Sequence, residues 1–180
     1  MAQGRLYTWA NLLTGVRLMT IPLSVWAVVY ARWDIALYVF VFAAVTDLLD
    51  GPVARRLNEA SPLGGLFDHA TDAAFVTCTL GACAAYHVIP WPLVVLIPAA
   101  FLQYTFDSRA LAGQSLRTSS LGRINGIAYF VLTGTVVVRE GLGLSWPPLA
   151  LVSAFAWLLV MSTVLSMADR WVTWRRLRSS

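Results

Sequence analysis

Long apolar runs alternate with short polar breaks along this chain of 180 residues. A helix that crosses the hydrocarbon core of a bilayer needs about 20 mostly apolar residues, and the sequence divides into six runs of about that length. The breaks are rich in Gly, Pro, Asp and Ser, which are typical of turns between helices. We therefore expect an all-α integral membrane protein with six transmembrane helices, at about residues 9–30, 35–55, 66–88, 91–110, 121–138 and 147–168.

The composition supports a membrane protein, because 58% of the residues are hydrophobic and only 12% are charged, whereas a soluble domain is about 25% charged. No internal repeat divides the sequence, so we expect a single membrane domain over residues 1–180. The first apolar run follows one arginine, Arg5, and has no small-residue cleavage site, so we expect it to be kept as a span. Membrane lipids are expected partners, and no nucleic-acid partner is expected.

Both ends of the sequence have features of membrane interfaces. Residues 1–10 mix Leu, Tyr and Trp with Gln, Gly and Arg, which predicts a short N-terminal helix lying in the interface. Residues 171–180 read WVTWRRLRSS, which predicts a basic C-terminal tail that contacts anionic lipid headgroups.

The arginines predict the orientation of the chain, since cytoplasmic loops carry the excess of basic residues. All 13 basic residues are arginine. If the N-terminus is cytoplasmic, eleven of them lie on the cytoplasmic side and only Arg32 and Arg139 lie on the other. We expect a multi-pass protein of the cell membrane with its N-terminus and its main polar hairpin in contact with the cytoplasm.

That polar hairpin runs from Asp47 to Asp72. Asp47 and Asp50 are three residues apart and share one face of a helix, and Asp68 and Asp72 are four residues apart on the next helix. Asn, Ser, Pro and Gly residues between positions 56 and 65 predict the turn that joins the two helices. The two carboxylate-bearing faces are therefore expected to converge.

Converging carboxylates repel one another unless a cation neutralises them. Oxygen ligands without His or Cys favour Mg²⁺, Mn²⁺ or Ca²⁺ over Zn²⁺. Arg55 offers a bidentate fork for a phosphate, and the small Gly51 and Ala54 leave room beside the helix for a phosphorylated ligand. The alternative is a polar hairpin whose carboxylates pair with Arg55 and Arg56, an arrangement that would tolerate almost any spacing. The expected metal ligands are Asp47, Asp50, Asp68 and Asp72.

The spacing of these residues is Asp-x2-Asp-Gly-x2-Ala-Arg-x8-Gly-x3-Asp-x3-Asp, from Asp47 through Gly64 to Asp72. It resembles, with no position missing, the signature of the CDP-alcohol phosphotransferase (CDP-alcohol phosphatidyltransferase) family of membrane enzymes. The resemblance implies transfer of a phosphatidyl group from CDP-diacylglycerol to an alcohol with release of CMP. It further implies two divalent cations, Mg²⁺ or Mn²⁺, held by the four aspartates, Asp72 as general base, and a homodimer.

The same resemblance implies a set of contacts to the CDP-lipid. The Asn-x2-Thr-x2-Arg pattern of Asn11, Thr14 and Arg17 resembles the start of the first span in many family members, where it lies near the nucleotide. Arg17 lies roughly 9 Å beyond Asn11 along a helix, which is deep for a side chain that only reaches headgroups, and its role is left open. The implied nucleotide or CDP-lipid contacts are Asn11, Thr14, Gly51, Ala54, Arg55 and Ser61.

The motif leaves the alcohol acceptor open, because relatives that carry it use glycerol 3-phosphate, inositol phosphate or phosphatidylglycerol. Arg109 and Arg123 lie nearest the predicted span ends and are the candidates for an acceptor pocket, which favours a phosphorylated polyol such as glycerol 3-phosphate. The alternatives are an inositol phosphate and phosphatidylglycerol, the cardiolipin-forming acceptor. Alternatives of another class are a cation transporter, which would place its acids through the depth of the membrane, and a non-catalytic membrane protein.

Overall fold

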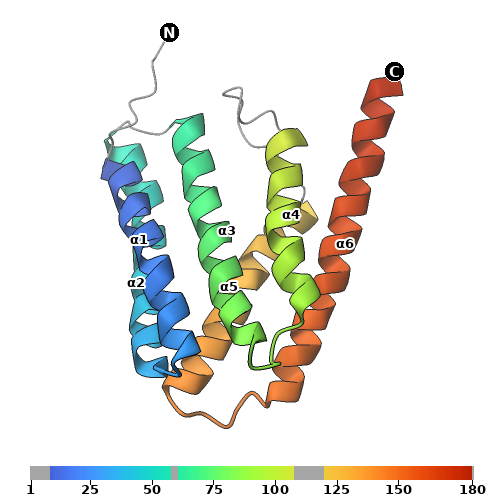
Figure 1. The fold of residues 1–180 in the computed structure, drawn as a ribbon. Helices are drawn as coiled ribbons and strands as arrows, with labels where there is room; N and C mark the ends of the chain where they lie inside the picture. Colours follow the sequence, from blue (N-terminus) through green and yellow to red (C-terminus); the bar gives the residue numbers. More distant parts are fainter. Residues whose placement is uncertain (1–8, 58–60, 108–119, 180) are drawn as a thin grey trace.

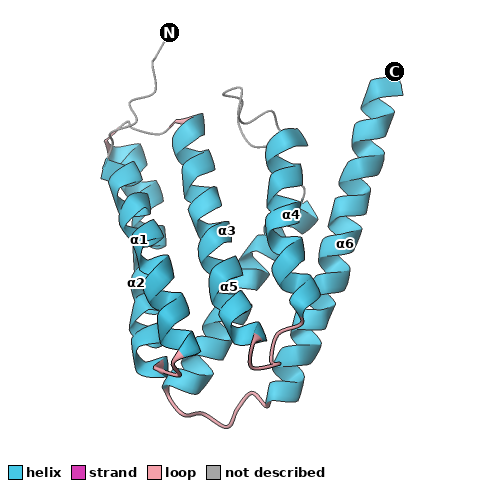
Figure 2. Cartoon of the chain, in the orientation of Figure 1, coloured by secondary structure: helices cyan, strands magenta, loops and turns pink. Residues whose placement is uncertain are grey.

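The computed structural model describes residues 9–57, 61–107 and 120–179. These residues form six α-helices, and the described part contains no strand (Figures 1 and 2). The helices are α1 (Trp9–Val29), α2 (Trp33–Arg56), α3 (Pro62–Ala84), α4 (Trp91–Asp107), α5 (Ser120–Gly141) and α6 (Leu149–Ser179).

The six predicted apolar runs coincide with these helices. The largest difference is at α6, which continues through the predicted tail as far as Ser179. At about 1.5 Å per residue, its 31 residues reach roughly 46 Å, which exceeds the hydrocarbon thickness of about 30 Å. Residues 1–8, most of the predicted interfacial helix, lie outside the described residues.

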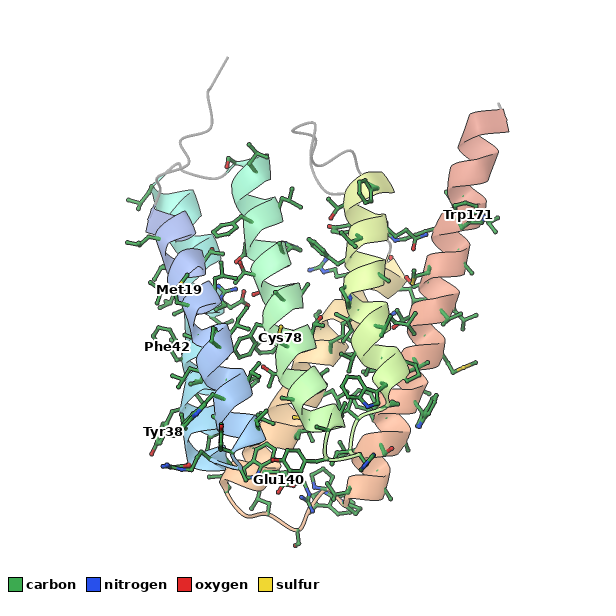
Figure 3. The ribbon with its side chains drawn as sticks, viewed as in Figure 1. Met19, Tyr38, Phe42, Cys78, Glu140 and Trp171 are labelled. Carbon is green, nitrogen blue, oxygen red and sulfur yellow. The ribbon has the colours of Figure 1, made fainter. Side chains whose placement is uncertain are left out.

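Three of the described helices are long and apolar enough to cross a membrane, through Leu12–Val29 of α1, Ser120–Gly141 of α5 and Leu149–Thr173 of α6. The apolar stretch Trp91–Phe106 of α4 is shorter. Large apolar side chains such as Met19, Tyr38, Phe42 and Trp171 are exposed and project away from the bundle (Figure 3). These features are those of a membrane protein, whose outer surface faces lipid.

Helix α1 packs against both α2 and α3. In addition α2 packs against α5, α3 against α4, and α6 against both α4 and α5. The last turns of α2, α4 and α6 and the first turns of α1 and α3 therefore lie at the same end of the bundle (Figure 1). The polar residues of the predicted hairpin belong to this end.

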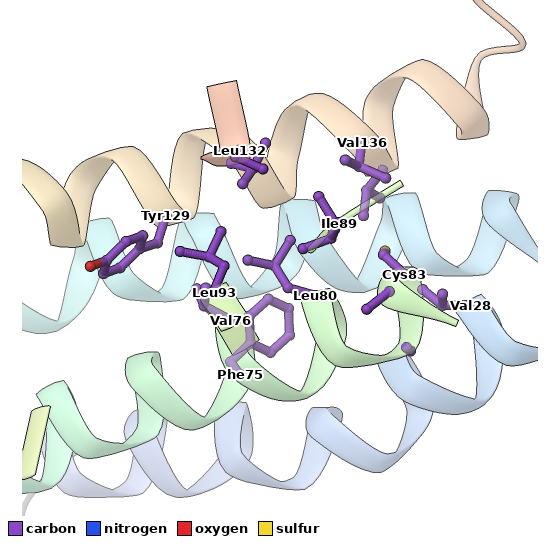
Figure 4. Close-up of a cluster of buried hydrophobic side chains, with 14 of the residues drawn as sticks. Val28, Phe75, Val76, Leu80, Cys83, Ile89, Leu93, Tyr129, Leu132 and Val136 are labelled. Atoms are coloured by element: carbon purple, nitrogen blue, oxygen red, sulfur yellow. The ribbon is translucent and has the colours of Figure 1, made fainter. Parts of the chain in front are cut away.

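All six helices contribute to the core, in which apolar side chains such as Val28, Leu80, Leu93 and Leu132 are fully buried (Figure 4). The contact between α2 and α5 depends on a glycine. A Cβ atom added at Gly134 would lie 2.6 Å from Cζ of Phe40, so the Phe40 ring packs on the bare backbone of this glycine and would have to shift for a larger residue. This contact holds α5 against the aspartate-bearing helix α2.

Candidate functional site

Three of the four predicted aspartates meet at the hairpin end of the bundle. Asp47 comes from α2, and Asp68 and Asp72 come from successive turns of α3. One carboxylate oxygen of each lies within 4.8 Å of the other two. The predicted convergence of the two helix faces is therefore confirmed for these three residues.

Arg17 joins the three carboxylates. Its Nη1 atom donates hydrogen bonds to Oδ1 of Asp47 and Oδ1 of Asp68, both at 3.2 Å, and to Oδ1 of Asp72. The Arg17 side chain is 1% exposed, whereas the carboxylate side chains are between 26% and 41% exposed. A buried positive charge from α1 thus faces three half-exposed negative charges from α2 and α3.

The remaining residues of the motif belong to the last turns of α2. Asp50, Gly51, Ala54 and Arg55 all lie within the helix, which ends at Arg56. Asp50 follows Asp47 by three residues, which places both on the same helix face. The side chains of residues 50–56 lie outside the described residues, as does that of Asn11 in α1, and Arg109 lies wholly outside them.

Ser61 caps the start of α3. It is the N-cap residue, and its hydroxyl accepts a hydrogen bond from the backbone N–H of Gly64 at 3.0 Å. Pro62 follows at the first helical position, where its missing N–H costs nothing. The cap fixes where α3 begins, and hence which turns carry Asp68 and Asp72. Thr14 is buried in α1, one turn before Arg17.

A cavity of about 620 Å³ adjoins the carboxylates and is lined by residues of α2, α3, α4, α5 and α6. Asp47 and Asp72 belong both to its lining and to the carboxylate cluster. Arg123, in the first turn of α5, also lines the cavity, whereas its predicted role at the acceptor stays a prediction. Most of the remaining lining is apolar, including Ile97, Ile127 and Val131.

Several polar residues of the cavity were missed in the sequence analysis. Gln103 donates through Nε2 to the carbonyl of Met167 at 3.0 Å, and Asn125 accepts through Oδ1 from the Ser162 hydroxyl at 2.6 Å. Their other amide atoms, Gln103 Oε1 and Asn125 Nδ2, are buried with no hydrogen-bond partner in the described part of the chain, as is the hydroxyl of Tyr104. In the sequence, each of these two amides lies within an apolar run. A polar side chain inside a membrane-spanning helix is costly, so it often marks a functional site.

Arg170 of α6 also lines the cavity, and its guanidinium lies 4.9 Å from the ring centre of Tyr104. In the sequence, Arg170 contributes only to the predicted orientation of the chain. The cavity therefore has two arginines, Arg123 and Arg170, and a group of unsatisfied amide and hydroxyl atoms in a mostly apolar wall. Such a site fits a ligand that is anionic, carries hydroxyl groups and has apolar parts.

The donor set of the carboxylate cluster fits a hard divalent cation. Asp47, Asp68 and Asp72 offer only oxygen, which is the ligand type that Mg²⁺ and Mn²⁺ prefer. His69 is next to Asp68, but its Nδ1 atom lies 2.9 Å from the carbonyl oxygen of Gly65. Among the described side chains, the residues that would hold a cation are therefore these three aspartates.

The sequence model of the CDP-alcohol phosphatidyltransferase family matches residues 7–174. A putative cardiolipin synthase of Mycobacterium tuberculosis (strain H37Rv) is 34% identical over 100 residues, which are 54% of this chain and 47% of the relative. The cardiolipin synthase (CMP-forming) of Streptomyces coelicolor is 34% identical over 100 residues, 52% of this chain and 46% of the relative. A CDP-diacylglycerol–glycerol-3-phosphate 3-phosphatidyltransferase of Pseudomonas fluorescens is 35% identical over 96 residues, 51% of this chain and 47% of the relative. The chain thus spans about half the length of the curated relatives it matches.

Proposed function

The chain belongs to the CDP-alcohol phosphatidyltransferase family, and we propose that it transfers a phosphatidyl group from CDP-diacylglycerol to an alcohol and releases CMP. The observation that carries this proposal is the position of Asp72. Its carboxylate belongs to the carboxylate cluster and also lines the cavity of about 620 Å³. A base in that position touches both the reacting phosphate and the incoming alcohol.

In the proposed reaction the alcohol oxygen attacks the phosphorus that carries the diacylglycerol. The bond from this phosphorus to the CMP oxygen breaks, and CMP leaves. Asp72 accepts the proton of the attacking hydroxyl, and Arg55, Gly51 and Ala54 contact the diphosphate from the last turns of α2. Two bound Mg²⁺ or Mn²⁺ ions, held by Asp47, Asp50, Asp68 and Asp72, would supply positive charge to the diphosphate.

We propose Asn11, Thr14 and Ser61 as further contacts to the nucleotide. Thr14 is buried and the Ser61 hydroxyl already caps α3, so a contact from Ser61 to a phosphate would use a remaining lone pair of the same oxygen.

For the acceptor we propose an anionic alcohol in the cavity, with its phosphate beside Arg123 and its hydroxyl toward Asp72. We propose Arg109 as a further residue of the same acceptor pocket. The unsatisfied atoms of Gln103, Tyr104 and Asn125 are suited to hydroxyl groups of the acceptor, because a buried polar atom without a partner costs about 1–3 kcal/mol. Discrimination among acceptors would come from these atoms.

Two observations favour phosphatidylglycerol over free glycerol 3-phosphate, the acceptor that Arg109 and Arg123 favour in the sequence. The cavity has a mostly apolar wall, which suits acyl chains better than a small polyol phosphate. Two of the relatives above carry the name cardiolipin synthase, and one carries the name of a glycerol-3-phosphate 3-phosphatidyltransferase. Both acceptors present a phosphate and a free hydroxyl, so both fit the same mechanism.

We further propose that all six helices cross the cell membrane and that the carboxylate cluster lies on the cytoplasmic side. The supporting observations are the apolar stretches of α1, α4, α5 and α6 and the arginines near the site end, including Arg17, Arg123 and Arg170. The basic end of α6 would then rest among anionic headgroups. We also propose that the protein forms a homodimer, and this proposal rests on family resemblance.

The acceptor is tested by product analysis. Purified full-length protein is incubated with Mg²⁺, CDP-diacylglycerol and, in separate reactions, phosphatidylglycerol, glycerol 3-phosphate, inositol 1-phosphate or no acceptor, and the lipids formed are identified by mass spectrometry. Formation of cardiolipin alone supports the proposed acceptor, and formation of phosphatidylglycerophosphate alone would support glycerol 3-phosphate, the acceptor favoured from the sequence. If no phosphatidyl ester forms with any acceptor, phosphatidyl transfer is refuted for these alcohols.

A further inference from the structure

The position of Arg17 bears on how a cation reaches the carboxylate cluster. Its Nη1 atom contacts one oxygen of each of the three carboxylates, at 3.2 Å for Asp47 and for Asp68 and also in direct contact with Asp72. One nitrogen atom therefore lies among three oxygens that come from two different helices. Because Arg17 is 1% exposed, this is an internal contact of the fold and not a surface ion pair.

A divalent cation would need the same region. Mg²⁺ binds oxygen at about 2.0–2.1 Å with strict octahedral geometry, and the three carboxylate groups that could supply its ligands lie within 4.8 Å of one another. The guanidinium nitrogen occupies the Oδ1 atom of each carboxylate, so a cation that binds through those oxygens must displace it. The two positive groups are thus alternatives for the carboxylate oxygens.

The helix packing explains why an arginine of α1 has this position. Helix α1 packs against both α2 and α3, so a side chain on the inner face of α1 lies between Asp47 on one side and Asp68 with Asp72 on the other. Arginine keeps its charge at any pH at which the protein is folded. It is therefore a permanent counter-charge for three carboxylates that would otherwise repel one another.

We propose that Arg17 is a tethered competitor of the divalent cation at this site. It holds the three carboxylates together, and it must give up contacts before a cation can bind them fully. The proposal rests on the metal-dependent function proposed above. Its consequence is that a cation alone binds weakly and gains affinity when the diphosphate of the CDP-lipid adds further oxygen ligands, since Mg²⁺ is commonly shared between carboxylates and a substrate phosphate.

The test measures binding of Mn²⁺ alone, without nucleotide or lipid substrate. The full chain is purified in detergent as wild type, Arg17→Met and Arg17→Lys, and free Mn²⁺ is followed by electron paramagnetic resonance. Arg17→Met removes the competing charge and keeps a flexible side chain, so we expect Mn²⁺ to bind at least about tenfold more tightly than to wild type, given the strength of charge-assisted hydrogen bonds. Arg17→Lys keeps the charge without the planar fork, and its affinity should fall between the two.

Arg32→Met is the matched control, because Arg32 pairs with the exposed Asp34 at the start of α2 and lies at the other end of that helix from the cluster. It should bind Mn²⁺ as wild type does. Thermal unfolding gives a second measurement. In a chelator Arg17→Met should unfold at a lower temperature than wild type, because its carboxylates lack a counter-charge, and Mn²⁺ should raise its unfolding temperature by more than it raises that of wild type.

If Arg17→Met does not fold, Arg17→Lys decides the question with the same measurement. Mn²⁺ affinity equal to or lower than that of wild type in the folded Arg17 variants would overturn competition, while leaving the cation site and the proposed function intact. If no protein, wild type or variant, bound Mn²⁺, the cation site itself would be refuted together with this proposal.

Discussion

Gly126 offers a way to fill the cavity without disturbing the fold. It lines the cavity from α5, and a Cβ atom added there would have no atom within 4 Å. Replacing a glycine inside a helix also favours the helix by about 1 kcal/mol. The series Gly126→Ala, Gly126→Leu and Gly126→Phe therefore adds increasing bulk to the cavity, and each variant is expected to fold.

The expected magnitude follows from the space available. A leucine-to-alanine truncation in another protein leaves a cavity of about 150 Å³, so a leucine at position 126 would take up roughly a quarter of the cavity of about 620 Å³. Forcing a ligand into overfilled space typically costs about 1–3 kcal/mol. The KM of the acceptor should therefore rise by about 5-fold to 150-fold in Gly126→Leu and more in Gly126→Phe.

The assay is CMP release at saturating CDP-diacylglycerol and varied acceptor, with unfolding temperature as the check on folding. Gly126→Ala should keep the acceptor KM of the wild type, because the methyl group is small. An acceptor KM that stays at the wild-type value in folded Gly126→Leu and Gly126→Phe would refute the assignment of this cavity to the acceptor.

Three further predictions concern the base, the helix packing and the acceptor phosphate. Asp72→Asn should lower the rate of CMP release by a factor of about 10² or more, measured in a single-turnover assay; full turnover would exclude Asp72 as the base. Gly134→Ala should destabilise the protein by about 1–3 kcal/mol, because the new methyl group would lie 2.6 Å from a phenyl ring of α2, whereas Gly126→Ala should not lower the unfolding temperature. Arg123→Ala should raise the KM of an anionic acceptor about tenfold or more, whereas Arg32→Ala should keep the wild-type KM. If the two variants had the same acceptor KM, Arg123 would not bind the acceptor phosphate.

The sequence predicts the helices and the aspartate cluster well because both depend on local spacing. Residues three and four apart share a helix face, so the positions of Asp68 and Asp72 follow from the sequence once α3 is known to begin after Ser61. Only a few residues separate the end of α2 at Arg56 from the start of α3 at Pro62, which brings this face near that of Asp47. For the same reason the boundaries of the six apolar runs agree with the helices to within a few residues, apart from the C-terminal extension of α6.

Other parts of the site depend on how the helices are packed, which local spacing does not determine. The contacts of Arg17 require α1 to lie between α2 and α3. Gln103 and Asn125 reach the cavity only because α4 and α5 are rotated to present those faces. Helix packing of this kind involves close contacts between residues far apart in the sequence, such as the one between Gly134 of α5 and Phe40 of α2.

The most direct test of the proposed function is CMP release by the purified full-length protein in lipid nanodiscs that contain CDP-diacylglycerol and phosphatidylglycerol. The measurement compares wild type with Asp68→Asn in Mg²⁺ and in a chelator, and Asp34→Asn is the matched control because Asp34 is exposed and pairs with Arg32. We expect CMP to be released by wild type and Asp34→Asn only with Mg²⁺, in an amount equal to the phosphatidyl ester formed, and at a rate reduced by a factor of about 10² or more in Asp68→Asn. CMP release that is unchanged in the chelator or in Asp68→Asn would contradict the assignment of the aspartate cluster as the metal-dependent active site.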